Sequence, residues 1–165
     1  MGNPRDEILK RMTQDIIRSN DKRAVYIVDG PPGSGKTTYV QKQKQPGDIV
    51  MDLDLIASAL QGDTIAHPDY NPVMEVVLSV REAIYNAIEA RQGKWKNAYI
   101  IISTPDKRVV NELANRLNGK VISLDVDETI CLEQIINDNT RTEKQRDIAL
   151  AKKWYENRNM LGNLR

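Results

Sequence analysis

The residues with the most capacity for chemistry form one segment, residues 30–37, which fits the phosphate-binding pattern G-x-x-x-x-G-K-[ST]. This segment and the residue after it are Gly30, Pro31, Pro32, Gly33, Ser34, Gly35, Lys36, Thr37 and Thr38. In such a loop, successive backbone N–H groups surround phosphate oxygens, and the next helix adds about half a positive charge at its N-terminus. Lys36 is expected to reach the β- and γ-phosphates, and the Thr37 hydroxyl to bind Mg²⁺. The loop therefore predicts a site for a nucleoside triphosphate, ATP or GTP, with Mg²⁺.

The sequence on either side of the loop favours the same interpretation. Residues 24–29 form a short apolar, β-branched run that is typical of a buried strand, and residues 38–42 can begin a helix. A glycine-rich turn that merely joins a strand to a helix has no need of the Lys-Thr pair. We therefore expect a strand, a phosphate loop and a helix in succession.

Phosphoryl transfer also needs a carboxylate that takes the proton of the acceptor or helps to hold the metal ion. A second short strand is expected over residues 48–52, and it brings Asp52 and Asp54 to the edge of the sheet where ligands bind. Asp54 is our choice for the base, narrowly over Asp52, and Asp52 is the expected partner of Mg²⁺; Asp54, or more weakly Ser103, is the alternative partner. The alternative is that an aspartate here caps the helix that follows Leu53.

Cations near the transferred phosphate are expected from the C-terminal part of the chain. Residues 137–141 form a polar, Asn-rich hinge, and residues 142–145 match the capping-box pattern that starts a helix. Lids are built from such segments. A lid over residues 137–146 would place Arg141 over the phosphates, with Arg146 as a further nucleotide contact. The alternative is that both arginines are solvated charges at a helix end.

Other polar residues near the predicted strand ends have structural explanations. The apolar run 99–103 ends in Ser103 and Thr104, without the acid that usually closes the second motif of phosphate-loop proteins. Thr104 is expected to cap the next helix, and Asp29 to close its strand. His67 lies in a Pro-rich loop and is expected to be an exposed bystander; the alternative is that it lines the acceptor pocket, if the helix over residues 73–91 forms a wall of that pocket.

The acceptor pocket is expected within residues 62–92, where the sequence offers few clues. These clues are Asp69, Tyr70 and Arg81. The helix over residues 73–91 is expected to form a wall of this pocket and to stop at Gly93.

Strands that alternate with helices predict an α/β fold of the three-layer P-loop NTPase type, with a mostly parallel sheet of four to five strands covered on both faces. We expect a single domain over residues 1–165. Its segments are an N-terminal helix over 4–19, a core over 24–136, a lid over 137–146 and a C-terminal helix over 147–160. The N-terminal helix is amphipathic and is expected to pack on the sheet; the alternative is that it meets a partner.

Composition narrows the class of protein. The net charge is +1, with 40% hydrophobic and 28% charged residues, so a general binder of nucleic acid or membrane surfaces is not expected. The one cysteine, Cys131, excludes an internal disulfide and a Cys-rich metal site. The chain lacks an apolar run of transmembrane length and the apolar core of a signal peptide. We expect a cytoplasmic protein without a membrane partner, and its oligomeric state is not readable.

Four segments together resemble small P-loop kinases, above all the kinase domain of phage polynucleotide kinase and related phage-encoded kinases. They are the loop GPPGSGKTT, the strand end MDLD, the strand YIIIS, and the ending with Arg141 followed by Lys152-Lys153-Trp154-Tyr155. The resemblance covers roughly residues 24–160. It implies an ATP–Mg²⁺ loop at residues 34–37, an acid at Asp54 or Asp52 that activates the acceptor hydroxyl, and a lid arginine at Arg141.

The expected activity is that of an ATP-dependent kinase that phosphorylates a hydroxyl of a nucleic acid or nucleotide. The resemblance implies a 5′-hydroxyl end, a modified base such as hydroxymethyluracil in DNA, or a free nucleoside or nucleotide as acceptor; a phage-encoded enzyme would work in the host cytoplasm. One alternative is a sugar-nucleotide or small-metabolite kinase of zeta-toxin type. Another is a nucleotide-gated ATPase or binding subunit, favoured by the N-terminal helix and the missing acid.

Overall fold

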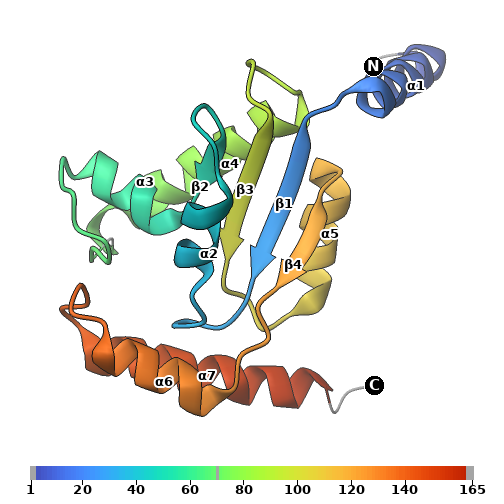
Figure 1. The fold of residues 1–165 in the computed structure, drawn as a ribbon. Helices are drawn as coiled ribbons and strands as arrows, with labels where there is room; N and C mark the ends of the chain where they lie inside the picture. The colour runs from blue at the N-terminus through green and yellow to red at the C-terminus, as the bar shows by residue number, and fades with distance from the viewer. Residues whose placement is uncertain (1–2, 70, 163–165) are drawn as a thin grey trace.

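The computed structural model describes residues 3–69 and 71–162, without the side chains of residues 14, 15 and 17–20. Its centre is a four-stranded parallel sheet with the order β2-β3-β1-β4 (Figure 1). The strands are β1 (Ala24–Asp29), β2 (Ile49–Met51), β3 (Asn97–Ile102) and β4 (Lys120–Ser123). The predicted α/β fold with a parallel sheet is confirmed.

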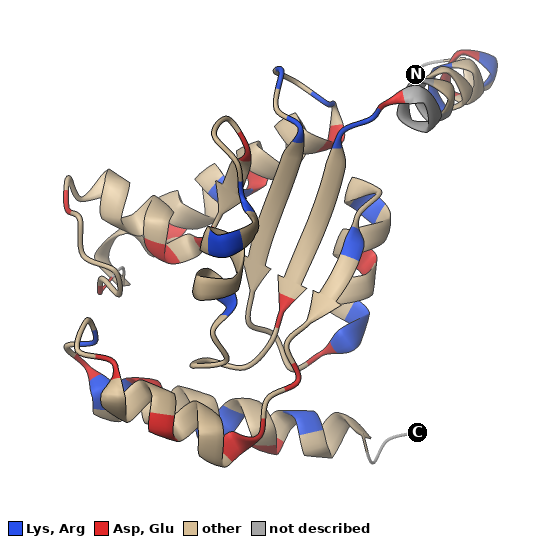
Figure 2. Ribbon diagram, in the orientation of Figure 1, with Lys and Arg blue, Asp and Glu red and all other residues tan. Residues whose placement is uncertain are grey.

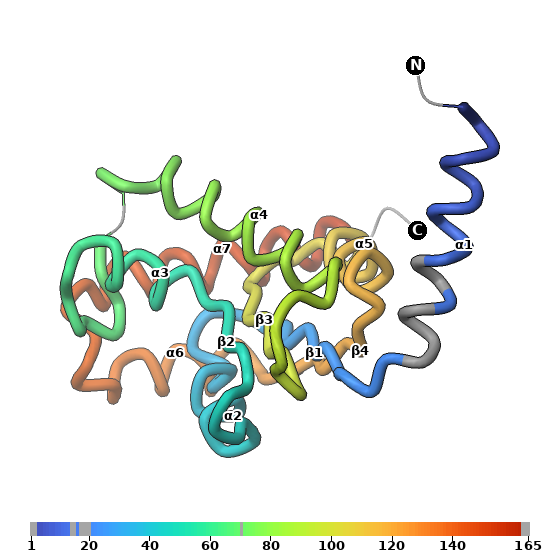
Figure 3. The backbone as a smooth tube through the Cα atoms, turned by 90° about the horizontal axis from the view of Figure 1, so that it is seen from above, coloured from blue at the N-terminus to red at the C-terminus, as the bar shows by residue number. Residues whose placement is uncertain are grey.

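Helices cover both faces of this sheet (Figures 1 and 3). The helices of the described residues are α1 (Pro4–Asn20), α2 (Lys36–Gln43), α3 (Leu53–Leu60), α4 (Met74–Glu89), α5 (Lys107–Leu117), α6 (Glu128–Asn137) and α7 (Lys144–Gly162), and a 3-10 turn, Asn71–Val73, precedes α4. Side chains alternate between the faces of a strand. Ile27 and Ile100 therefore pack in the core with α4 and α5, whereas Val28 and Ile101 pack with Val40 of α2.

The register of the strands brings the carboxyl ends of the central strands level with one another. Asp29, the last residue of β1, pairs with Ile102 of β3 on one side and with Ser123 of β4 on the other. The helices α6 and α7 pack together and run across this end of the sheet (Figure 1). The loop over residues 138–143, which joins them, therefore belongs to the ligand-binding edge of the fold.

The N-terminal helix does not pack on the sheet, and that prediction is wrong. Helix α1 projects away from the rest of the fold (Figure 1), and Ile8, Leu9 and Met12 are 57%, 60% and 57% exposed. Both faces of the sheet are already covered, by α2 on one side and by α4 and α5 on the other.

Two helix ends differ from the residues that local patterns favour. Asp106, and not Thr104, caps α5, since its side chain accepts a hydrogen bond from the Arg108 N–H at 2.9 Å. Helix α4 ends at Glu89, and the first left-handed residue after it is Arg91, with a φ of 54°, before Gly93 is reached. The Arg91 guanidinium donates to the carbonyls of Ile88 and Leu117, and these bonds offset the cost of a left-handed arginine. The bond to Leu117 in α5 is a contact that the local pattern could not indicate.

Candidate phosphate-binding site

The phosphate loop is packed so closely that two of its glycines, Gly30 and Gly33, have no room for a side chain. Gly33 and Gly35 have φ of 80° and 84°, a left-handed conformation that costs other residues energy. A Cβ on Gly33 would lie 2.7 Å from the Cys131 carbonyl oxygen in α6, and one on Gly30 would lie 2.9 Å from the Leu124 carbonyl oxygen after β4. The loop is therefore held between the end of the sheet and α6.

Lys36 lies inside this loop and is only 8% exposed. Its ammonium donates to the carbonyl oxygens of Gly30 at 2.8 Å and Pro31 at 2.7 Å. Burial lowers the pKa of Lys36 to about 8, although the carboxylates of Asp29 and Asp52 act in the opposite direction. An anion in the loop would stabilise the charged ammonium, so the site is suited to phosphate.

The start of α2 and the end of β2 carry the residues that fit Mg²⁺. Helix α2 begins at Lys36 with no side-chain cap, which places the Thr37 hydroxyl in its first turn, and the charges of Asp52 and Lys36 act on each other. Mg²⁺ in such enzymes is held by one or two protein oxygens together with phosphates and water. Among the described residues there is no group of three or more His, Cys, Asp or Glu that could hold a metal ion. Thr37 and Asp52 therefore fit an ion that is shared with the nucleotide.

Asp52 and Asp54 stand side by side after β2. The Asp52 carboxylate caps α3 by accepting the Asp54 N–H at 3.0 Å, so the capping alternative holds for Asp52. Burial, and then the charge of Asp54, raise the pKa of Asp52. The base role of Asp54 and the metal role of Asp52 remain predictions.

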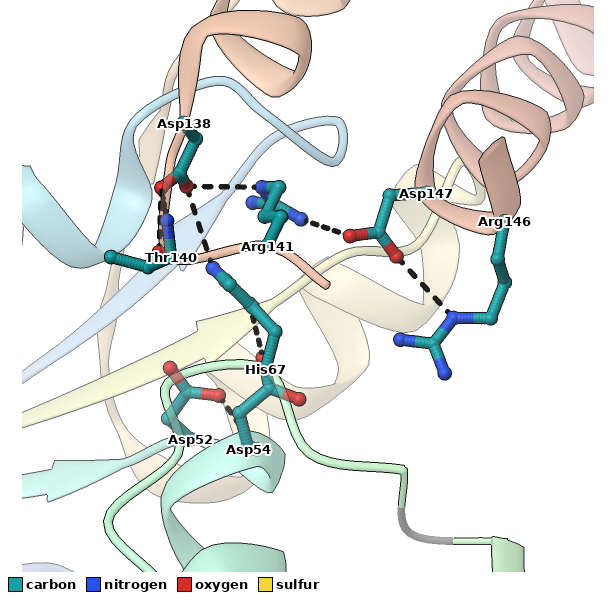
Figure 4. Close-up of polar contacts among 8 residues, drawn as sticks. All are labelled: Asp52, Asp54, His67, Asp138, Thr140, Arg141, Arg146 and Asp147. Atoms are coloured by element: carbon teal, nitrogen blue, oxygen red, sulfur yellow. Dashed lines mark hydrogen bonds and ion pairs between the residues drawn. The ribbon is translucent and has the colours of Figure 1, made fainter. Parts of the chain in front are cut away.

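His67 is not the exposed bystander that its loop suggested. Its side chain is 20% exposed, with Nδ1 at 3.1 Å from Asp54 Oδ2 and Nε2 at 3.6 Å from Asp138 Oδ2 (Figure 4). These partners lie on α3 and on the loop after α6. No local signal around residue 67 indicates them, since both are brought in by the tertiary fold.

Arg141 is a half-buried cation of the α6–α7 loop, and the alternative of a solvated helix-end charge does not hold for it. Its guanidinium contacts Asp138 at 3.1 Å and Asp147 at 2.8 Å, and its side chain is 14% exposed (Figure 4). The charge of Arg141 also acts on Lys36, so it lies within electrostatic reach of the phosphate loop. Arg146 is more exposed, at 39%, and contacts Asp147 at 3.4 Å.

Asp138 connects these groups. Burial raises the pKa of Asp138, but hydrogen bonds from Thr140 and the charges of Arg141 and His67 outweigh that effect, and the net direction is down. The carboxylate is therefore held in its ionised form between a histidine and an arginine.

Residues at the ends of β1 and β3 support the loop from behind. The Ser103 hydroxyl donates to the Gly30 carbonyl oxygen at 3.0 Å, which gives it a structural task. Asp29 is 2% exposed, and its backbone oxygen accepts the Leu124 N–H at 2.7 Å. Its Oδ1 has no hydrogen-bond partner within the described part of the chain, and burial raises its pKa against the charges of Lys36 and Arg158.

A shallow cleft of about 470 Å³ lies beside the phosphate loop. It is lined by Ser34, Gly35, Thr38, Tyr39, Lys42, Leu124 and Gln134. Sequence reasoning missed the last four of these residues, because they belong to three different segments. An aromatic ring, an aliphatic side chain, an amide and an amine suit the nucleoside part of a nucleotide.

The sequence clues to the acceptor pocket have tasks of their own. The Asp69 carboxylate accepts the Asn71 N–H at 3.1 Å, and the Arg81 guanidinium lies 5.8 Å from the ring centre of Tyr85. Tyr70 lies outside the described residues. The assignment of these residues to an acceptor pocket remains a prediction.

Comparison with known proteins identifies the fold. No protein-family model matches the chain, and no curated protein sequence is significantly similar to it. Among solved structures, TT1252 from Thermus thermophilus has a TM-score of 0.51 at 15% identity, over 84% of this chain and 85% of that one. Shikimate kinase from Acinetobacter baumannii, solved with shikimate, has a TM-score of 0.52 at 18% identity, over 87% of this chain and 80% of that one. A gluconokinase from Sinorhizobium meliloti 1021 has a TM-score of 0.47 at 13% identity, over 82% of this chain and 76% of that one.

Likeness at these identities establishes a shared fold, which is the α/β P-loop NTPase fold. The predicted resemblance to phage polynucleotide kinase in particular is not among these matches and stays a prediction. Within the described residues, no helix has both the length and the apolar character needed to span a membrane.

Proposed function

We propose that this chain is a P-loop kinase that transfers the γ-phosphate of ATP or GTP to an alcohol. The observation that carries the proposal is the buried Lys36 in a glycine-rich loop, with the acids Asp52 and Asp54 at the neighbouring strand end. Phosphoryl transfer needs positioning and neutralisation of charge more than covalent chemistry, and these residues supply both.

The residues have distinct tasks in this reaction. Lys36 exchanges its carbonyl partners for the β- and γ-phosphate oxygens. Thr37 and Asp52 would hold Mg²⁺, which would supply neutralisation of the charge on the phosphates. Asp54 takes the proton of the acceptor hydroxyl while the hydroxyl oxygen bonds to the γ-phosphorus and the bond to the departing diphosphate breaks. Arg141 stabilises the transferred group, and residues 138–143 act as the lid that brings it there.

Charge favours a small acceptor over a nucleic acid strand. The carboxylates of Asp54 and Asp138 both lie against His67, where we place the acceptor. Their negative charges would repel a polyanion bound at that place. Lys and Arg are distributed over the helices together with Asp and Glu (Figure 2), in keeping with a net charge of +1. We therefore favour a nucleoside, nucleotide or sugar, and regard 5′-hydroxyl ends and hydroxymethyluracil DNA as the competing acceptors.

A transfer assay with γ-labelled ATP or GTP tests the proposal. The acceptors are nucleosides, nucleoside monophosphates, sugars, sugar nucleotides, 5′-hydroxyl oligonucleotides and hydroxymethyluracil DNA. We expect label in a small acceptor, and a loss of about 100-fold or more in kcat for Asp54→Asn. Asp63→Asn is the matched control, since Asp63 is an exposed acid near α3. The proposal fails if no acceptor gains label, or if Lys36→Ala retains wild-type activity.

A second candidate is a nucleotide-gated ATPase or binding subunit. The exposed apolar side chains of α1 favour it, because such a surface suits a protein partner. Hydrolysis of ATP that a partner stimulates, with no acceptor phosphorylated, would support this candidate instead.

A further inference from the structure

His67 lies where the acceptor side and the α6–α7 loop meet. It belongs to the segment between α3 and α4, and its ring nitrogens face Asp54 on α3 and Asp138 after α6 (Figure 4). It is the single histidine of the chain. None of the tasks assigned so far to the loop, the acids or the arginines involves it.

We propose that His67 is a positioning residue that orients the Asp54 carboxylate and couples it to the lid over residues 138–143. The inference rests on the proposed function, because it takes Asp54 as the base of a kinase. It adds a physical connection between Asp54 and the lid, which the base role of Asp54 and the lid role of residues 138–143 do not themselves include.

The contact at Nδ1 orients the base. At 3.1 Å, an Nδ1–H donates to Asp54 Oδ2, which fixes the carboxylate and leaves Oδ1 for the proton of the acceptor. In the reaction, that proton passes to Oδ1 as the acceptor oxygen bonds to phosphorus and the diphosphate leaves. A carboxylate without this bond would rotate and spend less time in the productive orientation.

The contact at Nε2 connects the base to the lid. Nε2 lies 3.6 Å from Asp138 Oδ2, and that same oxygen accepts from Arg141 Nε at 3.1 Å. Arg141 in turn bonds to Asp147 at the start of α7. His67 thus ties Asp54 to the arginine that is to contact the transferred phosphate.

The two contacts of His67 differ in kind. The Nδ1 contact is a hydrogen bond at 3.1 Å, whereas Nε2 lies 3.6 Å from Asp138 Oδ2, at ion-pair distance. The imidazolium carries an N–H on both nitrogens, so it is the form that can face both carboxylates with a donor.

The nitrogen spectrum of the sole imidazole tests the first contact in the free protein. ¹⁵N chemical shifts report which ring nitrogen carries the proton. At a pH where the ring is neutral, we expect the proton on Nδ1 in the wild type and mainly on Nε2 in Asp54→Asn. Asp63→Asn should match the wild type. A wild-type ring protonated on Nε2, or no change in Asp54→Asn, overturns the inference.

Amide hydrogen exchange tests the second contact. In His67→Gln and in Asp138→Asn we expect amides 138–143 to exchange about tenfold faster than in the wild type, after correction for intrinsic rates, because opening costs about 1.4 kcal/mol less. Thr64→Ala, an exposed position in the same segment, is the control. Unchanged exchange in both variants contradicts the coupling.

Kinetics then separate the positioning role from the proposed function. With the acceptor found in the transfer assay, His67→Gln should lower kcat about 10- to 100-fold and leave the KM for ATP within about twofold of the wild type. If the enzyme is active and His67→Gln has wild-type kcat, the positioning role is wrong while the kinase stands. If no acceptor is phosphorylated but the tautomer and exchange results appear, the coupling stands and the base role of Asp54 falls.

Discussion

At the scale of single residues, the phosphate loop is the part of the site that the sequence specifies most fully. Its pattern of glycines, lysine and threonine predicts both the ligand and the backbone shape. The structure adds that Gly33 and Gly35 differ in the space around them. Gly33 lies against α6, whereas a Cβ on Gly35 would meet only the Gln134 side chain, at 4.0 Å.

This difference predicts unequal effects of two alanine substitutions. Gly35→Ala should lower the free energy of unfolding by about 1–2 kcal/mol, the cost of a left-handed alanine. Gly33→Ala should cost about 1–3 kcal/mol more, since its Cβ would overlap the Cys131 carbonyl oxygen and the Ile135 side chain. Urea denaturation of both variants measures the difference, and equal losses would show that α6 does not rest on the loop.

Lys36 predicts a pH dependence of nucleotide binding. Its pKa is about 8 in the free protein, and bound phosphates favour the ammonium and raise that value. Above pH 8, binding must therefore take up a proton, so the association constant of ATP falls by up to about tenfold per pH unit; below pH 8 this effect is absent.

Titration calorimetry between pH 7 and about 9.5 checks this dependence. Lys36→Ala should bind ATP more weakly and with no such fall. An association constant for the wild type that stays level above pH 8 would show that Lys36 does not contact the phosphates.

The residues that sequence reasoning missed share one property. His67, Tyr39 and Gln134 gain their roles only from neighbours that the tertiary fold supplies. Asp54 was singled out because it follows a strand, but its contact with His67 was not predicted, because a loop of Pro, Asp and Asn gives no period from which a neighbour can be inferred. Arg141 was singled out from the polar hinge around it, and its contacts with Asp138 and Asp147 lie within a few residues of it; its role toward the phosphates stays a prediction.

At the scale of elements, helix α6 controls the shape of the phosphate loop. Its buried residues Cys131 and Ile135 are both 0% exposed, and both lie against Gly33. The sequence predicted α6 but not its position, because an apolar stripe shows that a face is buried and not what covers it.

Neighbouring isoleucines at the end of α6 provide a matched test. Ile135→Ala removes a fully buried side chain and should cost about 2–5 kcal/mol of unfolding free energy, and it should weaken ATP binding as the loop loses its support. Ile136 is 54% exposed, so Ile136→Ala should stay within about 0.5 kcal/mol of the wild type in stability and leave ATP binding unchanged. Thermal or urea unfolding with calorimetric binding measures both, and a reversed order would contradict the packing.

At the scale of the whole molecule, the strand–helix alternation was enough to predict the sheet, its parallel strands and its covered faces. Helix α1 was placed wrongly, since amphipathic periodicity does not say whether the apolar face meets the same chain. The described part of α1 leaves Ile8, Leu9 and Met12 more than half exposed.

This arrangement predicts that α1 contributes little to the stability of the rest of the fold. The triple variant Ile8→Gln, Leu9→Gln, Met12→Gln keeps good helix formers and removes the apolar face. We expect its free energy of unfolding to stay within about 1.5 kcal/mol of the wild type, and its affinity for ATP to be unchanged. A loss of several kcal/mol in urea denaturation would show that the apolar face packs on the chain in solution.

The central claim is that residues 30–37 bind a nucleoside triphosphate through Lys36. Isothermal titration with ATP or GTP and Mg²⁺ at pH 7 tests it most directly. The account predicts one binding site per chain for at least one of these nucleotides, and an association constant lower by at least about 100-fold in Lys36→Ala. A folded wild-type protein that takes up neither nucleotide, or a Lys36→Ala variant that binds as tightly as the wild type, would contradict it.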